Sequence, residues 1–153
     1  MISTGDILVI GYGNELRGDD AIGLRVAEAV AAWQLPGVRA LAVPQLTPEL
    51  SEDIAAARQV VFVDATTEPV IHDVQVRPLD ARAVDSAGSH RSDPAGLLAL
   101  AQAVFGRTPP AWFMAVAATD FAFGAPLSPL AQRGVEAALA RLRQFCAARA
   151  APE

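Results

Sequence analysis

The clearest indication of the fold is the stretch Ile7-Leu-Val-Ile-Gly-Tyr-Gly-Asn14. Its first four residues form an uninterrupted apolar run of strand length, which is typical of a strand covered on both faces. Gly11 and Gly13 then predict a sharp turn. From Asp20 onward, apolar residues recur at helical spacing until Pro36-Gly37 ends the helix. A buried strand followed by a helix is the beginning of a β-α-β unit.

The same alternation of strand and helix continues along the chain. Further apolar runs predict strands at 38–43, 59–65, 70–78 and 111–118. Helices are expected after Thr47-Pro48, Asp93-Pro94 and Ser128-Pro129, because a capping side chain followed by proline begins a helix. Pro69 and Pro78 place the fourth strand at an edge of the sheet. We therefore expect an α/β fold: a three-layer α/β/α arrangement with an open, twisted, mostly parallel five-stranded sheet and helices on both faces.

Composition narrows the possible functions. The chain has 153 residues, of which 52% are hydrophobic, so we expect one domain over 1–150 and a frayed tail at 151–153. A net charge of −5 gives no electrostatic reason to expect nucleic acid or a membrane surface as a partner. All 12 basic residues are arginine, so mechanisms that need a lysine are excluded. The single cysteine excludes an internal disulfide and favours a cytoplasmic location.

Three side chains are expected to meet at one edge of this sheet. In open α/β sheets, functional groups collect beyond the carboxyl ends of the strands. Asp20 precedes the first helix, Asp64 ends the third strand, and His90 lies in a Gly-Ser loop before a helix. Two carboxylates and an imidazole form a three-ligand set with an open position, suited to zinc, nickel or manganese. The spacing alone leaves a helix cap open as the role of Asp20 and a turn as the role of Asp64.

The other candidate motifs give weaker indications of a catalytic or binding role. The glycine-rich turn resembles a dinucleotide-binding loop, but Leu16 stands where the third glycine would be, and no acidic residue follows the second strand. Cys146 is expected to be a small buried hydrophobe. His72 is expected inside the edge strand, either at the surface or partly packed. Asp120 fits either a turn or the acidic edge.

Three segments carry a resemblance to a known family. Gly11-Tyr-Gly-Asn-Glu-Leu-Arg-Gly-Asp-Asp-Ala-Ile-Gly23, Val61-Phe-Val-Asp-Ala65 and Gly88-Ser-His90 resemble the hydrogenase maturation endopeptidases, which process the large subunit of [NiFe] hydrogenases. The resemblance runs over most of the chain. It implies an endopeptidase that removes the C-terminal extension of the large-subunit precursor after nickel insertion.

The resemblance also implies how the site works. Asp20, Asp64 and His90 would be both the metal-binding and the catalytic residues. The nickel would arrive in the substrate precursor, although zinc or cadmium can occupy such a site in vitro, and no organic cofactor is needed. The family is sometimes classed with aspartic peptidases, yet Asp20 and Asp64 lack the Asp-Thr-Gly surroundings of that group.

One segment departs from part of the family. Some members carry Asp-Gly-Gly-Thr after the second strand, where this chain has Pro44-Gln-Leu-Thr-Pro48. We therefore expect Gln45, together with Asn14 and Asp19, to recognise the precursor. The precursor would be the protein partner of this chain, which is expected to be a monomer when it is free. Two alternatives remain: a nickel-sensing chaperone that does not cleave, and a small metal-dependent hydrolase acting on an unrelated substrate.

Overall fold

The structure is a computed structural model that describes residues 6–80 and 93–150. In these residues, one sheet contains the strands β1 (Ile7–Tyr12), β2 (Val38–Val43), β3 (Gln59–Thr66), β4 (Val74–Leu79) and β5 (Ala111–Ala117). The helices are α1 (Ile22–Trp33), α2 (Leu50–Ala56), α3 (Pro94–Phe105) and α4 (Pro129–Ala150), with the short 3-10 helices η1 (Gly18–Ala21) and η2 (Ile71–Asp73). None of the described helices is long and apolar enough to cross a membrane.

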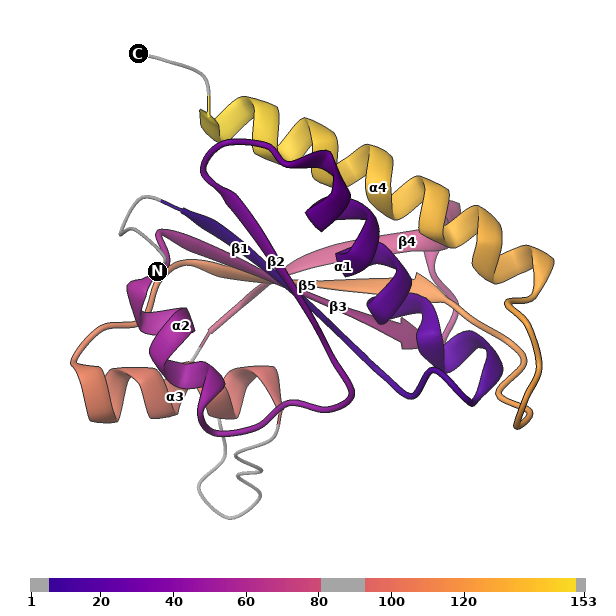
Figure 1. The fold of residues 1–153 in the computed structure, drawn as a ribbon, viewed down its shortest axis with the longest axis horizontal. Helices are drawn as coiled ribbons and strands as arrows, with labels where there is room; N and C mark the ends of the chain where they lie inside the picture. The colour runs from indigo at the N-terminus through magenta and orange to yellow at the C-terminus, as the bar shows by residue number, and fades with distance from the viewer. Residues whose placement is uncertain (1–5, 81–92, 151–153) are drawn as a thin grey trace.

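The sheet has the expected mixed topology. Its strand order is β2-β1-β3-β5-β4, and β4 is the one strand of these five that runs antiparallel to its neighbour. The parallel strands β1, β3 and β5 therefore end at the same edge (Figure 1). The edge position of β4, which its flanking prolines predicted, is confirmed.

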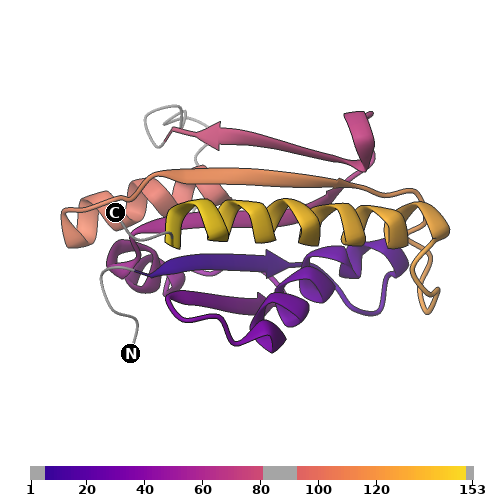
Figure 2. The same cartoon turned by 90° about the horizontal axis from the view of Figure 1, so that it is seen from above.

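Helices cover both faces of the sheet, as predicted. Helices α1 and α4 lie on one face, and α2 and α3 lie on the other (Figures 1 and 2). Successive residues of β1 point to opposite faces, so Leu8 and Ile10 pack toward α2 and α3, whereas Val9 packs toward α1 and α4. Because both faces are buried, the apolar run of β1 needs no alternation.

Two local predictions were wrong. The edge strand begins at Val74 instead of residue 70, because His72 and Asp73 have positive φ angles of 60° and 70°, which an extended strand does not allow. His72 is therefore in η2, where it is exposed. Thr47 does not cap α2: the amide of Leu50 donates to the Thr47 carbonyl at 3.1 Å in a preceding turn. The Asp93 cap is confirmed, since its carboxylate accepts from the Gly96 amide at 2.6 Å.

Glycines let α1 pack directly on the backbone of β1. A Cβ atom on Gly11 would lie 1.9 Å from the Gly23 carbonyl oxygen, and one on Gly23 would lie 2.5 Å from the Tyr12 carbonyl oxygen. Gly13 has a φ angle of +153°, and a Cβ there would lie 1.9 Å from the Asp20 carbonyl oxygen. These close approaches bring Asp20 beside the carboxyl end of β1. The three glycines therefore shape the edge of the sheet at which β1, β3 and β5 end, which we call the functional edge.

Replacing Gly23 should therefore destabilise the fold more than replacing a glycine that is needed only for its backbone conformation. Gly23→Ala inserts a methyl group between backbone atoms and should destabilise the fold by about 3 kcal/mol, near the upper end of overpacking costs. Gly37→Ala is the control: its φ angle is +76° but no atom lies within 4 Å of the added methyl, so it should cost only about 1 kcal/mol. Urea unfolding measures both. An equal loss in the two variants would contradict the close packing.

Candidate active site

Asp64 lies on β3 close to the carboxyl edge of the sheet. It comes two residues after Phe62, so its side chain lies on the face that α2 and α3 cover. Its Oδ1 accepts a hydrogen bond from the Ala65 amide at 2.8 Å. The carboxylate also accepts from the hydroxyl of Tyr12, the last residue of β1. Asp64 is thus a half-buried carboxylate whose orientation is fixed by neighbouring groups.

Asp20 approaches Asp64 from η1. Its Oδ2 accepts from the Asn14 amide at 2.8 Å, which anchors the side chain over the turn after β1. Burial raises the pKa of Asp64 to about 6, and the negative charge of Asp20 acts in the same direction, while the hydrogen bonds from Ala65 and Tyr12 oppose it. The two predicted carboxylates are therefore close enough to interact electrostatically.

Tyr12 is a site residue that the sequence analysis missed. Burial raises its pKa well above its usual range, and the charge of Asp64 and the hydrogen bond to it add to the effect, so the hydroxyl keeps its proton and acts as a donor. The available signal was a hydroxyl-bearing residue between two glycines at the end of an apolar strand. The sequence did not identify Asp64 as its partner, because β1 and β3 are separated by a helix, a strand and another helix.

Asp19 has a structural role in place of the predicted substrate contact. It is 0% exposed. Its Oδ2 accepts from the amides of Thr119 and Asp120 at 2.9 and 3.0 Å and from the Ser128 hydroxyl at 2.7 Å, and its Oδ1 accepts from the Ser128 amide at 2.7 Å. Burial acts to raise the pKa of Asp19, but these hydrogen bonds outweigh it and lower the pKa. The carboxylate therefore fastens η1 to the loop between β5 and α4.

The two other predicted recognition residues lie together. Asn14 and Gln45 line a groove of about 550 Å³ at the carboxyl ends of β1 and β2, and Glu15 and Leu16 also line it. Both Asn14 and Gln45 are exposed. The Asn14 Oδ1 accepts from the Leu16 amide at 2.8 Å, so this side chain also shapes the turn. Asp120, the other candidate for the acidic edge, accepts from the Ala122 amide at 3.0 Å, as a turn residue does.

The third predicted ligand, His90, lies outside the described residues. Within 6–80 and 93–150, no group of three His, Cys, Asp or Glu side chains is arranged to hold a metal ion. Asp93, three positions after His90 in the sequence, lies at the start of α3 and shares a hollow of about 410 Å³ with Tyr12 and Arg77. The beginning of α3 is therefore close to the residue that hydrogen-bonds Asp64.

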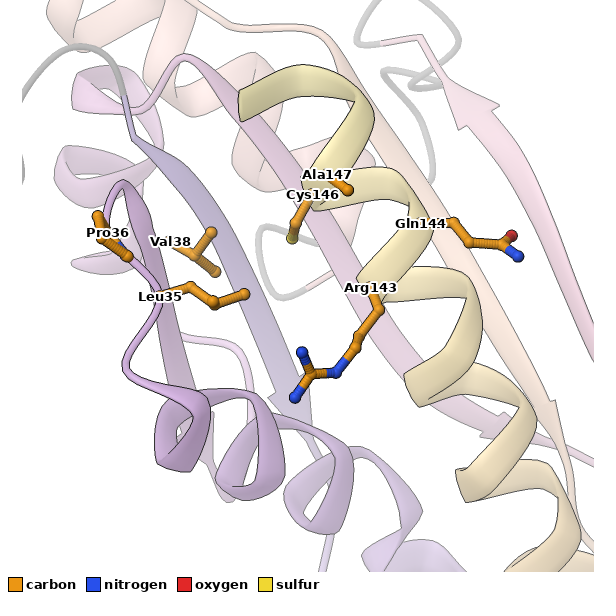
Figure 3. A pocket seen from close by; sticks show the side chains of 7 residues that line it. All are labelled: Leu35, Pro36, Val38, Arg143, Gln144, Cys146 and Ala147. Atoms are coloured by element: carbon orange, nitrogen blue, oxygen red, sulfur yellow. The ribbon is translucent and has the colours of Figure 1, made fainter. Parts of the chain in front are cut away.

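A separate hollow of about 600 Å³ lies at the opposite end of the sheet (Figure 3). It lies between α4 and the start of β2, and its lining includes Leu35 and Val38. The sulfur of Cys146 points into this hollow (Figure 3), and the residue is 2% exposed, as expected for a small buried hydrophobe. Arg143 stacks on the ring of Trp33 at 4.3 Å. Among the described residues, no acidic side chain lines this hollow, so this part of the lining lacks the carboxylates of the carboxyl edge.

Solved structures share this fold over almost the whole chain. The [NiFe] hydrogenase maturation protease HycI from Thermococcus kodakarensis KOD1 matches with a TM-score of 0.74 and 22% identity, covering 92% of this chain and 91% of that one. The hydrogenase maturating endopeptidase HybD from E. coli matches with a TM-score of 0.71 and 24% identity, again covering 92% and 91%. The hydrogenase 2 maturation peptidase from Thaumarchaeota archaeon SCGC_AB-539-E09 gives 0.66 and 22%, covering 92% and 97%. No family model and no curated protein matches the sequence. At these identities, the likeness shows that the chain has the fold of hydrogenase maturation proteases.

The pKa of Asp64 can be measured directly. In metal-free protein, the ¹³Cγ resonance of Asp64 should titrate with a midpoint near pH 6. Asp20→Asn removes a negative charge and should lower this midpoint, whereas Tyr12→Phe removes a hydrogen bond to the carboxylate and should raise it. Because the folded-state pKa lies above the ordinary value of 3.8, Asp64 should make the fold less stable as pH rises from about 4 to about 6. A midpoint near 4 that neither substitution moves would contradict the described contacts.

The Asp19 hydrogen bonds predict a large loss of stability. Asp19→Asn replaces an acceptor oxygen with an amide that faces backbone donors, and should destabilise the fold by about 3 kcal/mol at pH 7. Because the pKa of Asp19 is lowered below 3.8 in the folded protein, the difference from wild type should shrink as pH falls below about 4. Asp120→Asn is the control, since the amide oxygen can keep the bond to Ala122. Equal stability of the two variants at pH 7 would disprove the role of Asp19.

Proposed function

We propose that this chain is a hydrogenase maturation endopeptidase that removes the C-terminal extension of a [NiFe] hydrogenase large-subunit precursor after nickel insertion. One observation carries the proposal: Asp64 is a half-buried, hydrogen-bonded carboxylate coupled to Asp20 at the functional edge of a fold that solved hydrogenase maturation proteases share. The sequence motif from Gly11 to Gly23 supports it, because its glycines bring Asp20 to this edge.

In this proposal, Asp20, Asp64 and His90 read the nickel carried by the precursor. The chemistry of the donors supports the assignment, since carboxylate and imidazole bind borderline divalent ions. The repulsion between Asp20 and Asp64, which contributes to the raised pKa of Asp64, would be relieved by a divalent cation between them. The hydroxyl of Tyr12 supplies the outer hydrogen bond that orients a ligating carboxylate. Zinc or cadmium would be able to take the same position in vitro.

Nickel recognition would control cleavage through binding energy. A precursor that already holds nickel would gain ligands from the enzyme, whereas an empty precursor would gain none, so only the loaded form would be held tightly. Above pH 6, Asp64 is ionised and can accept a proton from a water molecule. The alternative is that the metal polarises the carbonyl of the scissile bond. Both routes use the same residues, and neither needs an organic cofactor.

The proposed reaction also requires a place where the precursor chain binds. The groove lined by Asn14 and Gln45 would receive the precursor chain, because it opens at the same edge as Asp20. Gln45 would therefore help to select among precursors. We assign the reaction to the cytoplasm, in keeping with the single cysteine of the chain. We also propose that the free enzyme is a monomer, which binds the precursor as its protein partner.

A cleavage assay tests the proposal. Purified protein should release a C-terminal peptide from a nickel-loaded precursor and leave the nickel-free precursor intact, as read from the intact mass of the precursor. Asp20→Ala, Asp64→Ala and His90→Ala should each reduce cleavage at least a hundredfold while the protein stays folded, because each removes one ligand. The controls are His72→Ala, an exposed histidine on η2, and Asp53→Ala, a partly exposed aspartate on α2. Both should cleave at the wild-type rate.

The outcomes of the assay separate the candidate functions. Binding of nickel-loaded precursor with no change in its mass would make the protein a nickel-sensing chaperone. No interaction with either precursor would favour a small metal-dependent hydrolase. Normal cleavage by all three site variants would overturn the assignment of the site.

A further inference from the structure

Two large apolar side chains are exposed on adjoining loops at the carboxyl edge of the sheet. Leu16, in the turn between β1 and η1, is 54% exposed, and Phe123, in the loop between β5 and α4, is 76% exposed. The Gly124 amide donates to the Leu16 carbonyl at 2.7 Å, which joins the two loops. Figures 1 and 2 both show these loops side by side at one end of the molecule. We refer to the two side chains as the Leu16–Phe123 patch.

The loops that carry the patch are firmly anchored. Asp19 binds the loop after β5 through its carboxylate, and its amide donates to the Asp120 carbonyl at 2.7 Å. A Cβ atom on Gly18 would lie 2.4 Å from the same carbonyl oxygen, so the backbones are in close contact. A surface that is already ordered loses little conformational entropy when a partner binds. The exposed side chains of Leu16 and Phe123 are therefore available on an ordered support as anchors for a bound chain.

The patch is continuous with the groove beside the candidate active site. Leu16 belongs to both, because it also lines the groove with Asn14 and Gln45. Within 6–80 and 93–150, the charged residues that line this groove are Glu15 and Glu28, and no arginine of these ranges lines it. The groove therefore favours a partner segment that is neutral or basic over an acidic one.

We propose that the Leu16–Phe123 patch is a docking surface for the polypeptide chain of the precursor. This inference rests on the proposed function. The patch would bury one aliphatic or aromatic side chain of the precursor, and the adjoining groove would hold a neutral or basic stretch of the same chain. Docking there would place the bound chain beside Asp20 and Asp64, so the patch would add affinity that does not depend on nickel.

Alanine substitutions with a matched control test this surface. Phe123→Ala and Leu16→Ala should each raise the Kd for nickel-loaded precursor about 10- to 100-fold, as truncation of an interface anchor does. Phe105→Ala is the control: Phe105 is 47% exposed and is the last residue of α3, and this helix ends away from the loops that carry the patch (Figure 1). It should leave the Kd unchanged. Thermal unfolding of all three variants checks that the substitutions act on binding instead of on folding.

The outcomes distinguish this proposal from the proposed function. If the wild type cleaves and Phe123→Ala binds as tightly as Phe105→Ala, the docking surface is wrong and the proposed function stands. If the wild type binds precursor without cleaving it, and Phe123→Ala weakens that binding, the docking surface stands and the endopeptidase does not. If the wild type neither binds nor cleaves any precursor, both are overturned.

Discussion

The buried carboxylate of Asp19 is the interaction on which the functional edge depends. Its two oxygens accept hydrogen bonds from three backbone amides and one hydroxyl, all contributed by residues 119–128, about a hundred positions away in the sequence. A buried charge is tolerated only when it is compensated in this way. The contact fixes η1, which carries Asp20, and also the loop that carries Phe123. One buried side chain thus positions both the segment that carries Asp20 and the loop that carries Phe123.

The surroundings of Asp64 raise the pKa of its carboxyl group without preventing its ionisation near neutral pH. Burial and the charge of Asp20 raise its pKa to about 6, while the Ala65 amide and the Tyr12 hydroxyl limit the rise. The group is therefore ionised near neutral pH but remains in an unfavourable electrostatic environment, which a divalent cation would improve. Such a site would gain more from a nickel-loaded substrate than from an empty one. In the proposed function, Asp20 would serve both as a ligand and as a source of this electrostatic cost.

Much of the fold was predictable because its signals are local. Apolar runs located β1, β2, β3 and β5, and the Asp93-Pro94 cap located α3. Contacts between distant segments have no comparable signal in the sequence. Asp19 and Asp20 are identical neighbours in the sequence, yet Asp19 is buried, whereas Asp20 accepts from the Asn14 amide and acts electrostatically on Asp64. Tyr12 was missed for the same reason. The left-handed backbone at His72 and Asp73, which shortens β4, also has no clear mark in the sequence. His90 lies outside the described residues and stays a prediction.

We propose above that Asp20 and Asp64 bind the nickel held by the precursor and so distinguish the loaded precursor from the empty one. The most direct measurement is the ratio of the Kd values for nickel-free and nickel-loaded precursor, taken for the wild type and for Asp64→Ala from binding recorded before cleavage begins, with the mass of the precursor checked to be intact at that time. The wild type should prefer the loaded precursor, and the ratio should approach one in Asp64→Ala, while the affinity for the empty precursor should be unchanged. The same preference for nickel in both proteins would contradict it.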